Sequence, residues 1–170
     1  MGTRLAIPRY LGIDWWWLLL VLIVEGTVRH YLPIPPWIPS ITVVWMVVQA
    51  AWLRSAEPRS KALYFYLAMA VIDLGLALAP STVNWLGDGS STVGGVIGAS
   101  IGLLDAGLTI VGIFVFRSEM EDHFNLTDPL GLGLSGVMTF FFSVFYFQYH
   151  FHELYERQQY EASLATPEPI

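Results

Sequence analysis

The chain has 170 residues, a formal net charge of −6 and no cysteine, and 55% of its residues are hydrophobic. Only 13% of the residues are charged, compared with about 25% in soluble domains, so the composition is that of a membrane protein. The lack of cysteine excludes disulfides, thiolate metal sites and cysteine nucleophiles. Because the sequence contains no basic patch, nucleic-acid binding is not expected.

The apolar residues fall into blocks rather than into short amphipathic repeats. These blocks predict an all-α fold, a polytopic membrane helix bundle with about five transmembrane helices. We expect one bundle over residues 1–155, followed by a polar C-terminal tail over residues 156–170. The expected spans, in chain order, are residues 11–28, 37–53, 63–79, 93–116 and 130–151.

The first span, residues 11–28, has the shortest uninterrupted apolar run, Trp15–Val24. Three tryptophans open this run, and tryptophan favours the boundary between lipid headgroups and hydrocarbon. The segment therefore either crosses the bilayer or lies along its surface.

The fourth span, Val93–Phe116, carries a regular stripe of small and polar residues. A helix of this length reaches about 36 Å, which exceeds a hydrocarbon core of about 30 Å. Steps of three or four residues place the stripe on one face of the helix, and its members are Gly94, Gly98, Gly102, Asp105, Thr109 and Gly112. Because small residues let helices approach closely in lipid, we predict that Gly94, Gly98 and Gly102 form a helix-packing groove.

Four polar residues are expected at mid-membrane depth. Asp73 and Asp105 lie near the centres of the third and fourth spans, and Thr139 and Ser143 lie near the centre of the fifth. An ionisable residue at this depth is costly and is a functional candidate by default. If the three helices are neighbours, the four residues form a polar intramembrane cluster that binds a proton, a cation or a polar ligand. In the alternative interpretation, the acids are protonated or hydrogen-bonded and only hold the bundle together.

The sequence predicts no catalytic residue and identifies no cofactor. The sequence contains no phosphate loop, no nucleophile elbow and no zinc-protease motif. His30 and His150, near the ends of the first and fifth spans, are weak candidates for a metal or tetrapyrrole ligand, because their spacing is not diagnostic.

The distribution of Lys and Arg predicts the orientation. In a five-span topology, six of the eight fall on one side, namely Arg4, Arg9, Arg54, Arg59, Lys61 and Arg117. Arg29 and Arg157 fall on the other side. By the positive-inside rule, we expect the N-terminus in the cytoplasm and the C-terminus outside.

The run Glu121–Leu154 contains PLGLGLSGVMTFFF and YFQYHF. It resembles the C-terminal stretch of small bacterial multi-pass membrane proteins that have no assigned activity. The resemblance covers about a fifth of the chain and implies a bacterial inner (plasma) membrane protein, without implying a function.

A second resemblance is to the translocator (tryptophan-rich sensory) family, which has five helices and binds tetrapyrroles and sterols. It is carried by IPPWIPSITVVW (Ile34–Trp45), AAWLR (Ala50–Arg54) and ALYFYL (Ala62–Leu67). The chain departs from the family at Asp73, where an asparagine is usual, and in its glycine-rich fourth span.

Together these observations predict an integral membrane protein that is not an enzyme. We expect a small subunit or assembly partner of a membrane complex, or a homo-oligomer, that packs through the glycine groove. The alternative is small-molecule or proton/cation binding or transport through the polar cluster, including tetrapyrrole binding as in the translocator family.

Overall fold

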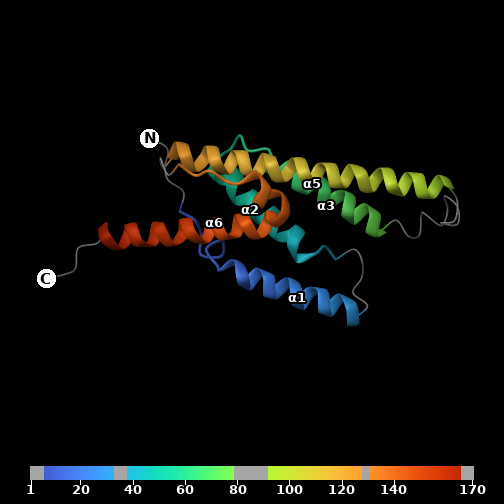
Figure 1. Cartoon of the computed structure of the whole chain (residues 1–170), viewed down its shortest axis with the longest axis horizontal. Helices are drawn as coiled ribbons and strands as arrows, with labels where there is room; N and C mark the ends of the chain where they lie inside the picture. The colour runs from blue at the N-terminus through green and yellow to red at the C-terminus, as the bar shows by residue number, and fades with distance from the viewer. Residues whose placement is uncertain (1–5, 33–37, 79–91, 128–130, 166–170) are drawn as a thin grey trace.

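The computed structural model describes residues 6–32, 38–78, 92–127 and 131–165. Within these ranges the chain forms α-helices and no strand, which confirms the predicted all-α class. The helices are α1 (Trp15–Tyr31), α2 (Ile41–Ala56), α3 (Ala62–Leu78), α5 (Thr92–Thr127) and α6 (Gly136–Ala165). Figure 1 shows α3 and α5 side by side, with α1 diverging from them at the lower edge of the molecule.

Two helices begin where an acid from a neighbouring helix meets their first N–H groups. At α2, the Ser40 hydroxyl accepts a hydrogen bond from the Val43 N–H at 3.3 Å, and the Glu25 carboxylate of α1 accepts one from the Ile41 N–H at 2.9 Å. At α3, the Glu119 carboxylate of α5 accepts hydrogen bonds from the N–H groups of Lys61 and Ala62 at 2.6 and 3.2 Å. Helix N-termini leave such groups unpaired and favour negative charge, so these acids set where α2 and α3 start.

In the described part of the chain, one helix is long and apolar enough to cross a membrane. It is the Gly98–Leu126 part of α5, which has 29 residues. The helices Ile41–Ala56 and Ala62–Gly75 are apolar but shorter. The five predicted spans therefore stay a prediction, with membrane crossing supported by length and composition for α5.

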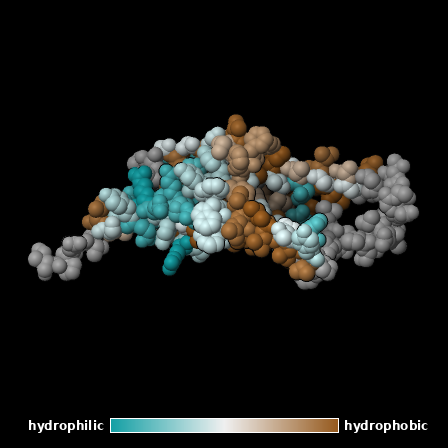
Figure 2. All heavy atoms as spheres, turned by 60° about the horizontal axis from the view of Figure 1, so that its bottom comes forward, coloured by the Kyte–Doolittle hydropathy of each residue, from teal (hydrophilic) through white to brown (hydrophobic). Residues whose placement is uncertain are grey.

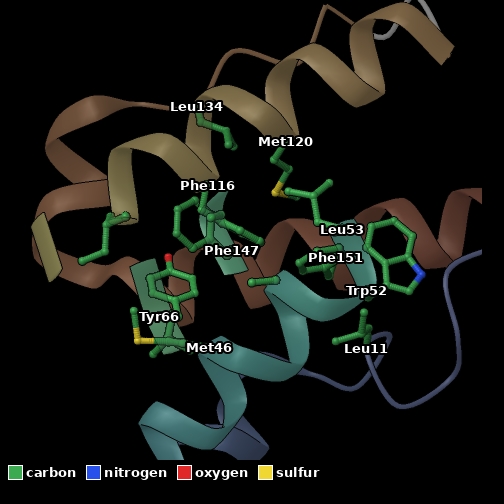
Figure 3. Packing of buried hydrophobic residues seen from close by; sticks show 14 of the residues in the cluster. Leu11, Met46, Trp52, Leu53, Tyr66, Phe116, Met120, Leu134, Phe147 and Phe151 are labelled. Carbon is green, nitrogen blue, oxygen red and sulfur yellow. The ribbon is translucent and has the colours of Figure 1, made fainter. Parts of the chain in front are cut away.

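The packed core lies where α2, α3, α5 and α6 meet (Figure 3). Phe116 of α5 contacts Phe147 of α6 with ring centroids 4.7 Å apart, and Trp52 of α2 contacts Phe151 of α6 at 5.3 Å. Tyr66 of α3 closes this aromatic cluster against Phe116. This shared aromatic cluster holds the four helices together.

Away from this core the helices pack sparsely. The side chains of Leu103 and Leu104 on α5 are 76% and 57% exposed, and Val71 on α3 is 68% exposed. In Figure 2 hydrophilic residues (teal) gather toward the end where α6 finishes, and hydrophobic residues (brown) form the adjoining surface. This separation of a polar end from an apolar body is typical of a protein that lies in lipid.

The C-terminal helix differs from the continuous span expected over residues 130–151. It begins at Gly136 and is broken at Ser143, whose φ of 25° and ψ of −100° are not helical. It then continues to Ala165, so residues 156–165 are helical rather than part of an irregular tail. Neither proline nor glycine stands between residues 137 and 160, so the local sequence carries no break signal.

Candidate functional site

Asp73 of α3 and Asp105 of α5 lie on the two helices of the α3–α5 pair, which make the most extensive helix–helix contact among the described residues. Asp73 and Asp105 lie within range of each other's charge. One carboxylate oxygen of Asp105 is buried and has no hydrogen-bond partner among the described residues. One turn further along α5, the Thr109 hydroxyl donates to the Asp105 carbonyl oxygen at 2.9 Å. The predicted pair of acids is thus brought together.

Asp73 also lines a cavity of about 750 Å³ between the end of α1, the start of α2 and residues 67–74 of α3. Its walls are mostly apolar and include Val43, Leu67 and Leu74, while Arg29 and Ser40 add polar groups. Arg29 is already engaged, because its guanidinium donates to Glu25 and to the carbonyl oxygens of residues 38 and 39. An apolar cavity of this size with few polar groups has the character of a small-molecule site.

The other two members of the predicted cluster, Thr139 and Ser143, lie on α6 and make no described contact with the aspartate pair. Thr139 is fully buried, and its hydroxyl has no hydrogen-bond partner among the described residues. Ser143 stands at the break in α6. In the described part of the chain, no hydrogen bond or charge interaction joins either residue to Asp73 or Asp105, so the cluster is represented by the aspartate pair.

The glycine stripe of α5 is used for packing at one end and is open at the other. A Cβ atom added at Gly112 would lie 3.1 Å from the Phe65 Cβ and from a Tyr66 ring carbon of α3. At Gly98 and Gly102 a Cβ atom would meet nothing within 4 Å, and both residues are exposed. Gly94 lies in the first turns of α5, but its surroundings are outside the described side chains.

The histidine candidates do not form a metal site within the described residues, where no group of three or more His, Cys, Asp or Glu side chains is placed to hold a metal ion. His30 is exposed at the end of α1, against the Tyr31 ring. His150 lies on α6 between Tyr146 and Tyr149, with its Nδ1 atom 3.3 Å from a Glu153 carboxylate oxygen.

A buried amide network, which the sequence analysis missed, joins α2, α6 and the segment before α1. The Gln148 side-chain oxygen accepts from the Trp45 indole N–H at 2.9 Å and from the Gln49 amide at 3.2 Å. Its amide nitrogen donates to the carbonyl oxygens of Leu11 and Ile13 at 2.8 and 2.7 Å. The only sign of this network in the sequence was Gln148, a single glutamine within an aromatic run.

The segment before α1 is held further by His152 of α6. One ring nitrogen lies 2.7 Å from the Gly12 carbonyl oxygen, and the other lies 3.0 Å from an Asp14 carboxylate oxygen. Further along α6, the Gln158 side chain accepts from the Ile7 N–H at 3.0 Å. These contacts make the N-terminal segment part of the folded unit, at the end where α6 finishes.

The relationship of the chain to known proteins bears on which of these sites matters. Comparison with protein-family models, with curated proteins and with solved structures found no match. The resemblances to small bacterial membrane proteins and to the translocator family therefore stay predictions. The geometry alone therefore gives two candidate functional features. They are the open end of the α5 glycine stripe and the Asp73–Asp105 pair beside its cavity.

Proposed function

We propose that this protein is a non-enzymatic subunit or assembly partner of a complex in a bacterial inner membrane, and that it binds a transmembrane helix of another chain. The binding surface is the N-terminal part of α5 around Gly98 and Gly102. Either a different subunit or a second copy of this chain supplies that helix.

Insertion in the bilayer is supported by the exposed apolar surface. Large hydrophobic side chains are exposed on every described helix, including Ile23 on α1, Val71 on α3, Leu103 on α5 and Phe141 on α6. Soluble monomers rarely expose contiguous apolar surface on this scale. In hydrocarbon the same surface carries no cost, because lipid tails are as apolar as leucine.

The observation that carries the assembly proposal is the unequal use of one helix face. Gly112 uses this face for a close approach of α3, whereas a Cβ atom added at Gly98 or Gly102 would meet none of the described residues within 4 Å. Small residues on a lipid-facing helix bury little against lipid but allow a second helix backbone to approach closely. A helix seated there would extend the packing that Gly112 already makes.

The Gly98→Leu variant tests this surface. Since an added Cβ atom meets none of the described residues within 4 Å, the variant should fold and unfold as the natural chain does. We expect it to lose the partner chain, because leucine fills the groove that a partner helix needs. The measurement is native mass spectrometry of the protein after gentle extraction from the membrane in which it is naturally made.

The matched control is Gly107→Leu, which adds the same side chain to another open position of α5. Nine residues of α-helix at 3.6 residues per turn place Gly107 about 180° from Gly98, so this variant should keep the partner. Loss of the partner in both variants, or in neither, would contradict the assignment of the binding face. The bound mass distinguishes a second copy from a different subunit.

A second candidate function is supported by the Asp73–Asp105 pair and the adjoining cavity. Two carboxylates in a low-dielectric site tend to share a proton or bind a cation. Asp73 faces both its partner acid and the cavity of about 750 Å³. This arrangement suits proton or cation transfer from the cavity to the buried carboxylate.

The Asp73→Asn variant tests this second function in proteoliposomes loaded with a pH-sensitive dye. Asparagine keeps the size of the side chain and removes its charge, so the fold should be retained while proton flux falls to that of protein-free liposomes. Glu153→Gln, which neutralises an exposed carboxylate on α6, should leave the flux unchanged. Natural protein with no flux above the protein-free level would reject proton transfer.

A further inference from the structure

The chain reverses direction between the end of α5 and the first part of α6. The Asn125 side chain of α5 pairs with Leu132, donating to its carbonyl oxygen at 2.9 Å and accepting from its N–H at 2.6 Å. Two residues on, the Leu134 N–H donates to Glu121 at 2.6 Å. Residues 132–134 therefore run antiparallel to the end of α5.

The chain then returns along the same stretch of α5. The Ser135 N–H donates to the Tyr146 hydroxyl at 2.9 Å. This hydrogen bond joins the segment before the break at Ser143 to the segment after it. Phe147 and Phe151 pack against Phe116, and α6 continues from there to Ala165. Figure 1 shows α6 (red) finishing on the same side of the molecule as the end of α5 (orange). Residues 132–154 therefore form a hairpin with the break at Ser143 near its tip.

The tip of this hairpin is apolar and has few contacts within the chain. The side chains of Val137 and Phe141 are 67% and 71% exposed, and Phe140 and Phe142 are also exposed. In contrast, Thr139 and Val144 on either side of the break are buried. Irregular backbone at membrane depth is tolerated where protein covers it, and the break at Ser143 lies between these two covered residues.

The positive charges agree with a hairpin rather than with a crossing. Six of the seven Lys and Arg residues in the described ranges belong to the segment before α1, the junction of α2 and α3, or the second halves of α5 and α6: Arg9, Arg54, Arg59, Lys61, Arg117 and Arg157. Only Arg29 lies at the opposite end, beside the start of α2. A crossing of the membrane by residues 130–151 would move Arg157 to the side of Arg29 and weaken this asymmetry.

The geometry points to a re-entrant hairpin over residues 132–154 that dips its Val137–Phe142 tip into the bilayer hydrocarbon and returns to the side it entered from. Both ends of the chain then lie on the cytoplasmic side, in place of the outside location expected for the C-terminus from a fifth crossing. The inference rests on the proposed membrane insertion of the protein. Its ligand is the acyl region of the lipids, which takes up the aromatic side chains that the bundle leaves exposed.

Single cysteines test the topology cleanly, because the chain has none of its own. The three variants are Ser163→Cys near the end of α6, Asp122→Cys at the polar end of α5 and Leu32→Cys after α1, all at exposed positions. A membrane-impermeant maleimide is applied to right-side-out and to inverted vesicles. We expect Ser163→Cys and Asp122→Cys to react in inverted vesicles, and Leu32→Cys to react in right-side-out vesicles.

Reaction of Ser163→Cys together with Leu32→Cys would overturn the hairpin and restore a fifth crossing. The proposed membrane insertion is tested separately on the same samples. Release of the natural chain from the vesicles by alkaline carbonate would reject insertion itself, whatever the labelling pattern.

A fluorophore on Phe141→Cys tests the tip. In vesicles of phosphatidylcholine, an environment-sensitive dye at this position should emit at shorter wavelength than the same dye on Ser163→Cys, and doxyl-labelled phosphatidylcholine should quench it. A short-wavelength emission without quenching would place the tip against protein, and emission like that of Ser163→Cys would place it in water. Either of these two results would reject insertion of the tip into lipid.

Discussion

Replacing Gln148 with leucine is expected to lower the free energy of unfolding by about 4 kcal/mol, since each buried polar group left unpaired costs about 1–3 kcal/mol. The side chain is fully buried and makes four hydrogen bonds, two to side chains of α2 and two to carbonyl oxygens of the segment before α1. Leucine is similar in size but pairs with none of them. Unfolding of the purified protein, followed by circular dichroism during titration of mixed micelles with a denaturing detergent, measures the change.

The control for this variant is Gln159→Leu, which makes the same substitution at an exposed position of the same helix. It should change the free energy of unfolding by no more than about 0.5 kcal/mol. Equal stability of the two variants would mean that the amide network contributes little to the fold.

Replacing Glu119 with alanine is expected to destabilise the protein by about 3 kcal/mol, because hydrogen bonds to a charged group are each worth about 1.5–3 kcal/mol. Its carboxylate accepts from the Ser60 hydroxyl at 2.6 Å and from the N–H groups of Lys61 and Ala62. Removing it leaves the N-terminus of α3 uncapped where Ser60 and Ala62 are buried. The same detergent titration measures the loss.

Asp122→Ala is the matched control, since it removes an exposed carboxylate from the same part of α5. We expect it to leave stability within about 0.5 kcal/mol of the natural chain. Glu119→Gln should fall between the two, because glutamine retains one acceptor oxygen without the charge. If Glu119→Ala and Asp122→Ala were equally stable, the cap on α3 would not be a stabilising contact.

The sequence predicted the helices better than their ends. The second span was expected to begin at residue 37, but α2 begins at Ile41, directly after Pro39 and the capping residue Ser40. Proline disfavours helix in the residue before it, and Ser40 supplies the cap. The fourth span was expected to end at Phe116, where the charges begin, but α5 continues to Thr127.

This longer α5 has a tertiary cause. Glu119 and Glu121 find hydrogen-bond donors in the chain around α3 and α6. The charges of Glu119 and Glu121 would end an isolated membrane span. Here they are hydrogen-bonded, so α5 continues past the apolar region into the polar end of the molecule. Only the folded arrangement contains this information.

The candidate site was predictable only in part, because helical spacing places residues on one face but does not give the contacts between distant segments. The regular spacing on α5 placed Asp105 and the glycines on one face, and the meeting of Asp105 with Asp73 followed from the pairing of α3 with α5. The separate location of Ser143 could not be foreseen, because no proline or glycine marks the break in α6 and the contact of Tyr146 with Ser135 across it exists only in the folded chain. The Gln148 network was missed for a related reason, since its partners come from distant parts of the chain.

The lengths of the helices have a consequence for the surrounding lipid. With 17, 16 and 17 residues, α1, α2 and α3 are about 24–26 Å long, several ångströms less than a hydrocarbon core of about 30 Å. If α1, α2 and α3 cross the bilayer as predicted, the lipids next to them thin locally, whereas α5, with 36 residues, is long enough to span it. Such a mismatch costs a fraction of a kcal/mol per ångström and draws a protein toward thin membrane or toward neighbours that share the thinned region. The bilayer itself would then help to concentrate this protein beside other short-spanned proteins.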